Sequence, residues 1–531
     1  MSKQVSLENI TIGQMLRRSA RQFPEQPALE YCDQVWCYQG FDAQVDVVAR
    51  KLLTLGVQKG DHVGIWCEAE PNAIFLLYAL ARIGAVVVML NTSLQKQELR
   101  KLLEKTDVRF LAIGDGYKEL NYPSLCRDIA ANLPAMEKIF YIGQNGCPEG
   151  YGCLPEQLAP REVLQAAEYA VQSQDTSFIL FTSGTTSIPK AVMTNHYSRV
   201  NNAIQQVMDL DATEQDRFCA AMPIFHCFCL TVNVLGACAV GACLVLPKAR
   251  KTAILLEAVS RRKCTVMSCV PALYHAMLCR EDFDAWDVSS LRTGYIGGSI
   301  YSTELFKEIE RRFQMTLMSS LGQTEATGGV TSAHLTDPLD VRASTVGQFI
   351  ANSEGKIVHT ETGKEQPCGE AGEICVKGYL VMQGYYGQPD ETAKAVDRDG
   401  WLHTGDIGYL DESGYVHLTG RLKEMIIRGG ENIAPGEIER VLLSDPRVSA
   451  AKVVGVPDPH YTEAVCACIV PLAPISEEEV RDLVKGTLAD FKVPRYVLFF
   501  DSFPQTATKK IDGKTIQKQA IAWLFPEKCA E

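Results

Sequence analysis

Helix-like and strand-like segments alternate along the first part of the chain. Segments whose apolar residues recur with the helical period are separated by short apolar runs typical of buried strands. The predicted elements are, in chain order, helix 41–55, strand 62–67, helix 72–83, strand 85–90, helix 97–105 and strand 109–113. This alternation is typical of parallel α/β layers. We therefore expect an α/β fold with a large, multi-layer N-terminal part of mixed sheets and helices.

Two long apolar stretches, 74–90 and 228–246, would each pass a coarse test for a membrane span. Both contain an internal Gly-Ala pair and end in a strand-like run. This pattern favours a buried helix, a turn and a buried strand, so no membrane span is expected.

Glycine becomes frequent between 379 and 436, and a new pattern begins after it. A strand is predicted over 425–428, a helix from Pro435, and a strand over 451–456. Proline suits the first turn of a helix. These features place a boundary near 419–423 and predict two units: an N-terminal part, 1–420, and a small mobile α+β domain, 421–531.

Composition narrows the class of protein. The chain has 531 residues, which is too many for one compact core, and 46% of them are hydrophobic and 22% charged, as in an ordinary soluble protein. The net charge of −12 argues against a nucleic-acid partner. The net charge does not exclude a small anionic ligand, because a pocket in an acidic protein can be locally positive.

The 19 cysteines are scattered, without a C-x-x-C pair. Two C-x-C pairs occur, Cys227/Cys229 and Cys466/Cys468, and in a strand such a pair points to one buried face. Unpatterned thiols fit a reducing compartment. The N-terminal residues do not resemble a signal peptide. A cytoplasmic protein is expected.

A hydroxyl-rich loop follows a short apolar strand at 178–181. Its hydroxyls, backbone N–H groups and terminal lysine could surround a polyphosphate. It lacks the Walker A and Rossmann spacings. The candidate phosphate-binding residues are Thr182, Ser183, Gly184, Thr185, Thr186 and Lys190.

The residues of this loop resemble the phosphate-binding signature of the adenylate-forming superfamily, which includes acyl-CoA synthetases, peptide-synthetase adenylation domains and luciferases. Further segments resemble motifs of the same superfamily in the same order. They are 223–226 (PIFH), 321–325 (LGQTE), 372–373 (GE), 401–406 (WLHTGD), 420–424 (GRLKE), 429–433 (GGENI), 491–494 (FKVP) and 504–511. Together they span most of the chain.

The resemblance implies that a carboxylic acid reacts with ATP at the α-phosphorus. A carboxylate is already ionised at pH 7 and needs no general base. The obstacle is the approach of two anions, which calls for positive charge, a metal ion and alignment. A site built on lysine and Mg²⁺ is therefore expected, with ATP, Mg²⁺ and coenzyme A as the small molecules bound.

The resemblance also implies roles for single residues. Thr324 would contact the α-phosphate, and Glu325 would help to hold Mg²⁺. Asp406 would accept hydrogen bonds from the ribose hydroxyls, assisted by Arg421. The remaining expected adenine contacts are Gly298, Ser299, Leu321 and Gly322.

A second group of roles falls in the C-terminal domain. Lys510 would bridge the carboxylate and the phosphate; we prefer it to Lys509 because Ile511 fixes the register. Lys423 would be the hinge between two poses of this domain. Gly429 and Gly430 would approach the pantetheine arm of coenzyme A.

Three positions depart from the common pattern. Ser187 replaces a glycine in the phosphate loop, Leu321 replaces the aromatic residue that stacks on adenine, and Lys509 replaces the glycine before the catalytic lysine. Weakened or altered activity is therefore an open alternative.

His226 would lie at the mouth of the acyl pocket, and the expected pocket residues are Phe228, Val232, Ile296 and Gly297. The surrounding segments, 228–232, 270–274, 295–299 and 317–321, carry no charged residue. An apolar monocarboxylic acid, fatty or aromatic, is therefore expected. The alternatives are a carnitine-type acid, or loading of an acyl or aminoacyl group onto a separate carrier protein. A homodimer is possible.

Overall fold

The computed structural model describes residues 5–127, 129, 133–182, 189–428, 431–458, 462–485, 487–506 and 510–526. It confirms every helix and strand predicted between residues 41 and 113 to within a few residues. The helices of the large part are α1 (Ile12–Gln22), α2 (Tyr38–Leu55), α3 (Pro71–Ile83), α4 (Lys96–Lys105), α5 (Tyr122–Cys126), α6 (Arg161–Ala170), α7 (His196–Asp209), α8 (Gly236–Val240), α9 (Thr252–Arg262), α10 (Pro271–Leu278), α11 (Thr303–Phe313), α12 (Leu339–Ser344) and α13 (Pro389–Ala395).

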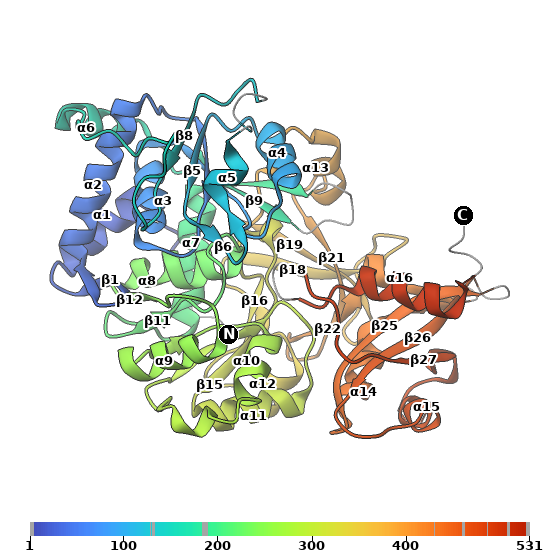
Figure 1. The fold of residues 1–531 in the computed structure, drawn as a ribbon. Coiled ribbons are helices and arrows are strands. Elements are labelled where there is room, and N and C mark those ends of the chain that lie inside the picture. Colours follow the sequence, from blue (N-terminus) through green and yellow to red (C-terminus); the bar gives the residue numbers. More distant parts are fainter. Residues whose placement is uncertain are drawn as a thin grey trace.

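Two seven-stranded sheets form the body of the large part (Figure 1). The first, in spatial order, is β20 (Gly384–Tyr385), β10 (Lys190–Asn195), β9 (Thr176–Thr182), β4 (Val86–Met89), β3 (His62–Trp66), β5 (Phe110–Ile113) and β8 (Lys138–Tyr141). The second is β15 (Thr316–Ser320), β14 (Thr293–Gly297), β13 (Val266–Met267), β11 (Arg217–Cys219), β12 (Cys243–Leu246), β1 (Pro27–Tyr31) and β2 (Gln34–Cys37).

Most neighbouring strands in both sheets are parallel, as the alternating pattern predicts. One large apolar core joins facing strands of the two sheets through α1, α3 and α7. The outer face of the second sheet packs against α9, α10 and α11, and that of the first against α4 and α5. The order of layers is therefore helix, sheet, helix, sheet, helix, which confirms the expected α/β class.

An antiparallel sheet follows, in the order β18 (Ser353–Val358), β19 (Gly372–Gly378), β21 (Leu402–Leu410) and β22 (Val416–Arg421). Short pairs lie elsewhere: β6 (Gly116–Tyr117) with β7 (Leu120–Asn121), and β16 (Thr331–Ser332) with β17 (Gln348–Phe349). In Figure 1 the antiparallel sheet lies toward the small C-terminal part, which is coloured orange to red.

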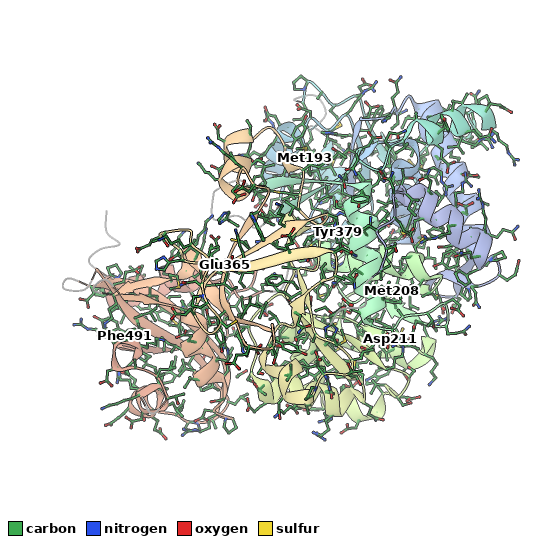
Figure 2. All side chains as sticks on the ribbon, turned by 180° about the vertical axis from the view of Figure 1, so that it is seen from behind. Met193, Met208, Asp211, Glu365, Tyr379 and Phe491 are labelled. Atoms are coloured by element: carbon green, nitrogen blue, oxygen red, sulfur yellow. The ribbon has the colours of Figure 1, made fainter. Side chains whose placement is uncertain are left out.

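The small part is a five-stranded sheet with helices on both faces. Its elements are β23 (Ile426–Arg428), β24 (Glu431–Ile433), α14 (Pro435–Leu443), β25 (Val448–Asp458), β26 (Thr462–Pro471), α15 (Glu477–Lys485), β27 (Tyr496–Phe499) and α16 (Gly513–Leu524). Alternate residues face opposite sides of a strand. Val453 therefore packs toward α14 and α15, while Val454 packs toward α16. Figure 2 shows Phe491 on this part and Met193 and Tyr379 on the large part.

The long apolar stretches are buried, as predicted. Residues 74–90 form most of α3, a turn and β4. Residues 228–246 contain the π-helix Cys229–Leu235, then α8 and β12. Within the described residues, no helix is long and apolar enough to cross a membrane.

The cysteine pairs differ in their setting. Cys466 and Cys468 lie in β26 and point to the same buried face. Cys227 and Cys229 are also buried, but they precede and begin the π-helix and do not lie in a strand. Every cysteine that the structure describes is an unpaired thiol.

Candidate active site

The phosphate-loop residues are anchored by a hairpin. β9 ends at Thr182 and β10 begins at Lys190, and these two residues are direct partners in the antiparallel ladder. Ser183, Gly184, Thr185, Thr186 and Ser187 lie outside the described residues. Thr182 and Lys190, described residues on either side of this segment, are therefore held next to each other.

Lys190 is held by acidic and aromatic neighbours. Its Nζ lies 2.6 Å from Glu391 Oε2 and 4.4 Å from the centre of the Tyr385 ring. The same tyrosine donates its hydroxyl hydrogen to Glu325 Oε1 at 3.0 Å. Tyr385 therefore connects the lysine at the loop to the candidate metal ligand.

Burial raises the pKa of Glu325, and the charges of Arg421 and Lys190 oppose this rise. The carboxylate thus faces two cations, and one of its oxygens is fixed by Tyr385. A carboxylate is a suitable ligand for Mg²⁺, which prefers oxygen. The residues present therefore fit this ion.

The loop that carries Thr324 and Glu325 is held by hydrogen bonds from buried side chains. Thr327 has a φ of 65° and therefore lies in the left-handed region, which is uncommon for a residue other than glycine. The buried Arg199 donates to its carbonyl oxygen at 2.7 Å, and Thr231 donates to it at 3.1 Å. Buried hydrogen bonds thus hold this strained residue in place.

Asp406 and Arg421 are cross-strand partners in β21 and β22. Arg421 Nε donates to Asp406 Oδ1 at 2.8 Å. The other oxygen, Oδ2, is buried and has no hydrogen-bond partner in the part of the chain that the structure describes. Burial raises the pKa of Asp406, and Arg421 opposes this rise. A buried acceptor without a partner is costly, and a ribose hydroxyl would satisfy it.

Lys510 reaches the site from the small part. A Cβ added to Gly298 would lie 3.4 Å from Lys510 Nζ. Burial and the charge of Arg421 lower the pKa of Lys510, while Cys227 and Asp406 oppose the shift. The structure therefore places the ammonium group between the end of β14, the carboxylate of Asp406 and the segment that contains His226.

His226 is neutral at physiological pH. Burial, with the charge of Lys510, lowers its pKa to about 3. Its Nδ1 accepts the Phe228 N–H at 3.3 Å. Thr324 Oγ1 donates to the neighbouring Cys227 Sγ at 3.6 Å. Of these two residues, Lys510 is therefore the one that carries a positive charge.

The expected acyl-pocket residues divide between two cores. Val232 is buried in the π-helix and Phe228 packs against the same large core. Ile296 is buried in the other core, among the helices outside the second sheet. Gly297 ends β14, and a Cβ there would lie 2.7 Å from Ser320 O. Their contact with an acyl chain stays a prediction.

The residues predicted to contact adenine also differ in exposure. Gly298 and Ser299 are exposed, as is Gly322. Leu321 is buried in a cluster with Ala326. Its place in this core gives a packing reason for an aliphatic residue there, and its contact with adenine stays a prediction.

Lys423, the predicted hinge residue, is exposed in the short 3₁₀ turn Leu422–Glu424, and its hinge role stays a prediction. The adjacent Glu424 binds Lys452 of the small part, with Nζ and Oε2 2.7 Å apart. Gly429, Gly430 and Lys509 lie outside the described residues.

Sequence reasoning missed several residues of the site. Tyr385 and Glu391 contact Lys190 across a long separation in sequence, and no local pattern marks them. Gln323 was inside a recognised motif: its Nε2 donates to Thr404 O at 2.8 Å. Its Oε1 is buried without a partner among the described residues, and an amino group of a bound ligand would satisfy it.

Comparisons with known proteins found similarities that extend over most of the chain. The profile of the family described as AMP-binding enzyme matches residues 16–386, and that of the AMP-binding enzyme C-terminal domain matches residues 437–510. The Bacillus subtilis protein YngI is 37% identical over 533 residues, covering 96% of this chain and 97% of its own.

Two further similarities extend over almost the whole chain. The mitochondrial medium-chain acyl-CoA ligase of Bos taurus is 32% identical, and the match covers 97% of this chain and 88% of the relative. The crystal structure of the anthranilate CoA ligase AuaEII in complex with anthranoyl-AMP superposes with a TM-score of 0.85. It is 25% identical, and the match covers 98% of each chain.

Proposed function

From the premise that the chain belongs to the AMP-binding enzyme family, we propose that it is an acid–thiol ligase that joins a monocarboxylic acid to coenzyme A. In the first step a carboxylate oxygen attacks the α-phosphorus of ATP. The bond between this phosphorus and the bridging oxygen breaks, and pyrophosphate leaves. In the second step the sulfur of coenzyme A attacks the acyl carbon, AMP leaves with the bonding electrons, and the thiol proton passes to solvent.

One observation carries this proposal. Lys510 extends from the small part to lie beside Gly298, with Asp406 and Arg421 as charged neighbours. Its charge would reduce the repulsion between the carboxylate and the phosphate, and its position would align them. The neutral His226 would line the path of the acid without competing for its charge.

The nucleotide would be held by groups of the large part. Asp406 Oδ2 would accept a ribose hydroxyl, Thr324 would donate to the α-phosphate, and Lys190 would contact the outer phosphates. Mg²⁺ would be held by Glu325 and would supply charge neutralisation to the phosphates.

The acid is proposed to be apolar, either fatty or aromatic. The lining segments carry no charged residue, and Phe228 and Val232 supply apolar surface. The relatives' names include a medium-chain acyl-CoA ligase and an anthranilate CoA ligase, which are compatible with either choice. Each pocket methylene discriminates by only ~1–3 kcal/mol, so a range of chain lengths is expected to react.

The experiment is pyrophosphate release from ATP and Mg²⁺ across fatty and aromatic acids, each with and without coenzyme A. The proposal predicts that one acid class gives release that coenzyme A accelerates, with an acyl-CoA product. Release that coenzyme A leaves unchanged would indicate a carrier protein as the acceptor. ATP binding without release for any acid would contradict the enzymatic proposal.

A reducing compartment, the cytosol in our proposal, agrees with the unpaired thiols. Cell fractionation would test it, since one relative is named as mitochondrial. A homodimer stays a prediction, which light scattering would check.

A further inference from the structure

Three side chains of different chemistry converge on one face of the antiparallel sheet. Glu373 and Cys375 are two residues apart in β19, so they share a face. His403 of β21 is the direct cross-strand partner of Cys375. An irregularity in the register between Glu373 and Cys375 brings all three together.

The distances between these three side chains suit a metal ion bound by all of them. His403 Nδ1 lies 2.8 Å from Glu373 Oε2 and 3.5 Å from Cys375 Sγ. One possible ligand atom from each residue lies within 4.8 Å of the other two. Two ligands of a tetrahedral zinc ion, one nitrogen and one sulfur, are about 3.5 Å apart, given the usual bond lengths. A nitrogen and an oxygen ligand of the same ion would be about 3.4 Å apart. Because His403 Nδ1 and Glu373 Oε2 are 2.8 Å apart, the Glu373 carboxylate would move away by about 0.6 Å.

Two charged groups of opposite sign lie beside the three residues, and the acidic one favours a cation. Asp397 Oδ2 lies 3.7 Å from His403 Nε2, on the far side of the ring from Nδ1. A carboxylate on that side orients a metal-binding imidazole and increases its basicity. The nearby Lys356, opposite Cys375 in β18, is the opposing charge, and its ammonium lies 4.0 Å from the centre of the Trp401 ring.

The cluster is also accessible from one side. The Cys375 side chain is buried, that of Glu373 is 11% exposed, and that of His403 is 32% exposed. A small ion can therefore reach the cluster, and a water molecule can complete its coordination.

We propose that Glu373, Cys375 and His403 bind a divalent cation of the zinc class, with a fourth position open to water. Thiolate, imidazole and carboxylate are the ligands that zinc shares with cobalt, whereas Mg²⁺ prefers oxygen alone. The site is separate from the magnesium site proposed at Glu325, and it does not depend on the proposed ligase activity.

Such an ion would act on the nucleotide site through one contact. The Gly405 N–H donates to Glu373 Oε1 at 2.9 Å, and Gly405 directly precedes Asp406. A cation at Oε2 would fix the carboxylate and, through it, the backbone beside the proposed ribose contact.

The test is titration of the full chain with Co²⁺ in excess Mg²⁺, followed by absorbance. One equivalent should give a thiolate-to-cobalt charge-transfer band, which Zn²⁺ should displace. Cys375→Ser should abolish the band, and His403→Gln should weaken binding at least tenfold. Asp397→Asn should weaken it about 10–100-fold, the usual effect of losing an outer partner.

Cys279→Ser is the matched control, because Cys279 also lies beside a histidine, with its Sγ 3.4 Å from His275 Nε2, but in an exposed position. It should leave the band unchanged. No band in the wild-type chain, a band that survives in Cys375→Ser, or a band lost in Cys279→Ser would each overturn the proposal. Should Cys375→Ser fail to fold by circular dichroism, His403→Gln decides.

Discussion

The two parts of the molecule contribute to the site in different ways. In the large part, the candidate nucleotide contacts are tied to buried structure: Arg199 holds the loop at Thr327, and the Asp406 carboxylate is enclosed. In the small part, the Lys510 carbonyl oxygen accepts the Thr506 N–H at 2.8 Å. The candidate nucleotide contacts are thus part of the core of the large part, whereas Lys510 belongs to the small part and lies against them.

The difference between the two parts predicts that ATP binding and the adenylation step can be changed separately. Changes in the large part should act mainly on ATP binding, whereas changes at Lys510 should act on the rate of adenylation. Changes where the two parts meet should affect the rate without affecting the fold of either part.

Lys510→Ala should have the largest effect. Loss of a charge that acts on the reacting groups costs about 10²–10³-fold in kcat. The KM for ATP should change little, because the nucleotide contacts lie on the large part. Pyrophosphate release measures both constants. Lys514→Ala, an exposed lysine in the same segment, is the control, and an equal loss there would contradict the assignment.

Asp406→Asn should act on ATP binding. A hydrogen bond to a charged group contributes ~1.5–3 kcal/mol, so the KM for ATP should rise by about 10–100-fold with a smaller change in kcat. Glu412→Gln, an exposed acid in the same hairpin, should leave both unchanged. An unchanged KM in Asp406→Asn would exclude the proposed ribose contact.

Gly436→Ala should disturb the contact between the parts. A Cβ at Gly436 of α14 would lie 2.4 Å from Thr419 O and 2.6 Å from Ile300 Cδ1, both in the large part. Overpacking costs ~1–3 kcal/mol, so the adenylation rate should fall by about 5–150-fold if this cost displaces the small part from the large one. Circular dichroism should stay unchanged. Gly152→Ala, where a Cβ meets no atom within 4 Å, should leave the rate intact.

His196→Asn should change the pH dependence of stability. Burial lowers the pKa of His196 to about 4, against about 6.5 in the unfolded chain. The unfolded state therefore binds more protons below pH 6.5, and up to about 3 kcal/mol of stability is lost as the pH falls from 6.5 to 4. Urea unfolding between these pH values should show that His196→Asn loses less stability than the wild-type chain as the pH falls. His275→Asn, at a partly exposed histidine, should show the same change of stability with pH as the wild-type chain.

Glu391→Gln should have the smallest effect. This acid binds Lys190 at 2.6 Å and competes with phosphate for its charge. A partly exposed ion pair contributes ~0–1 kcal/mol, so the KM for ATP should fall by at most about fivefold. Lys394→Gln, which removes the other partner of Glu391, should not lower it. A raised KM in Glu391→Gln would show that Glu391 positions Lys190.

Local patterns predicted the helices and strands well, because the period and the length of an apolar pattern depend on residues that are neighbours in sequence. The helices near 41–55 and 72–83 and the buried strand at 85–90 are confirmed. The π-helix Cys229–Leu235 was not predicted, because its apolar run fits any buried helix.

Motif residues could be named from the sequence, and the structure brings Lys510, His226, Asp406 and Arg421 together. The pairing of Lys190 with Glu391 and of Cys375 with His403 could not be predicted, because strand register and long-range packing set both. Ile296 shows the same limit: a one-residue step along β14 moves a side chain from one core to the other.

Because Lys510 is proposed to act between the carboxylate and the phosphate, it should serve the first step and not the transfer to coenzyme A. The direct test supplies Lys510→Ala with the preformed acyl-AMP of the acid found by the panel, together with coenzyme A, and measures acyl-CoA formation. We predict transfer at a rate close to that of the wild-type enzyme, although the same variant should lose about 10²–10³-fold in adenylation. An equal loss in both steps would contradict it.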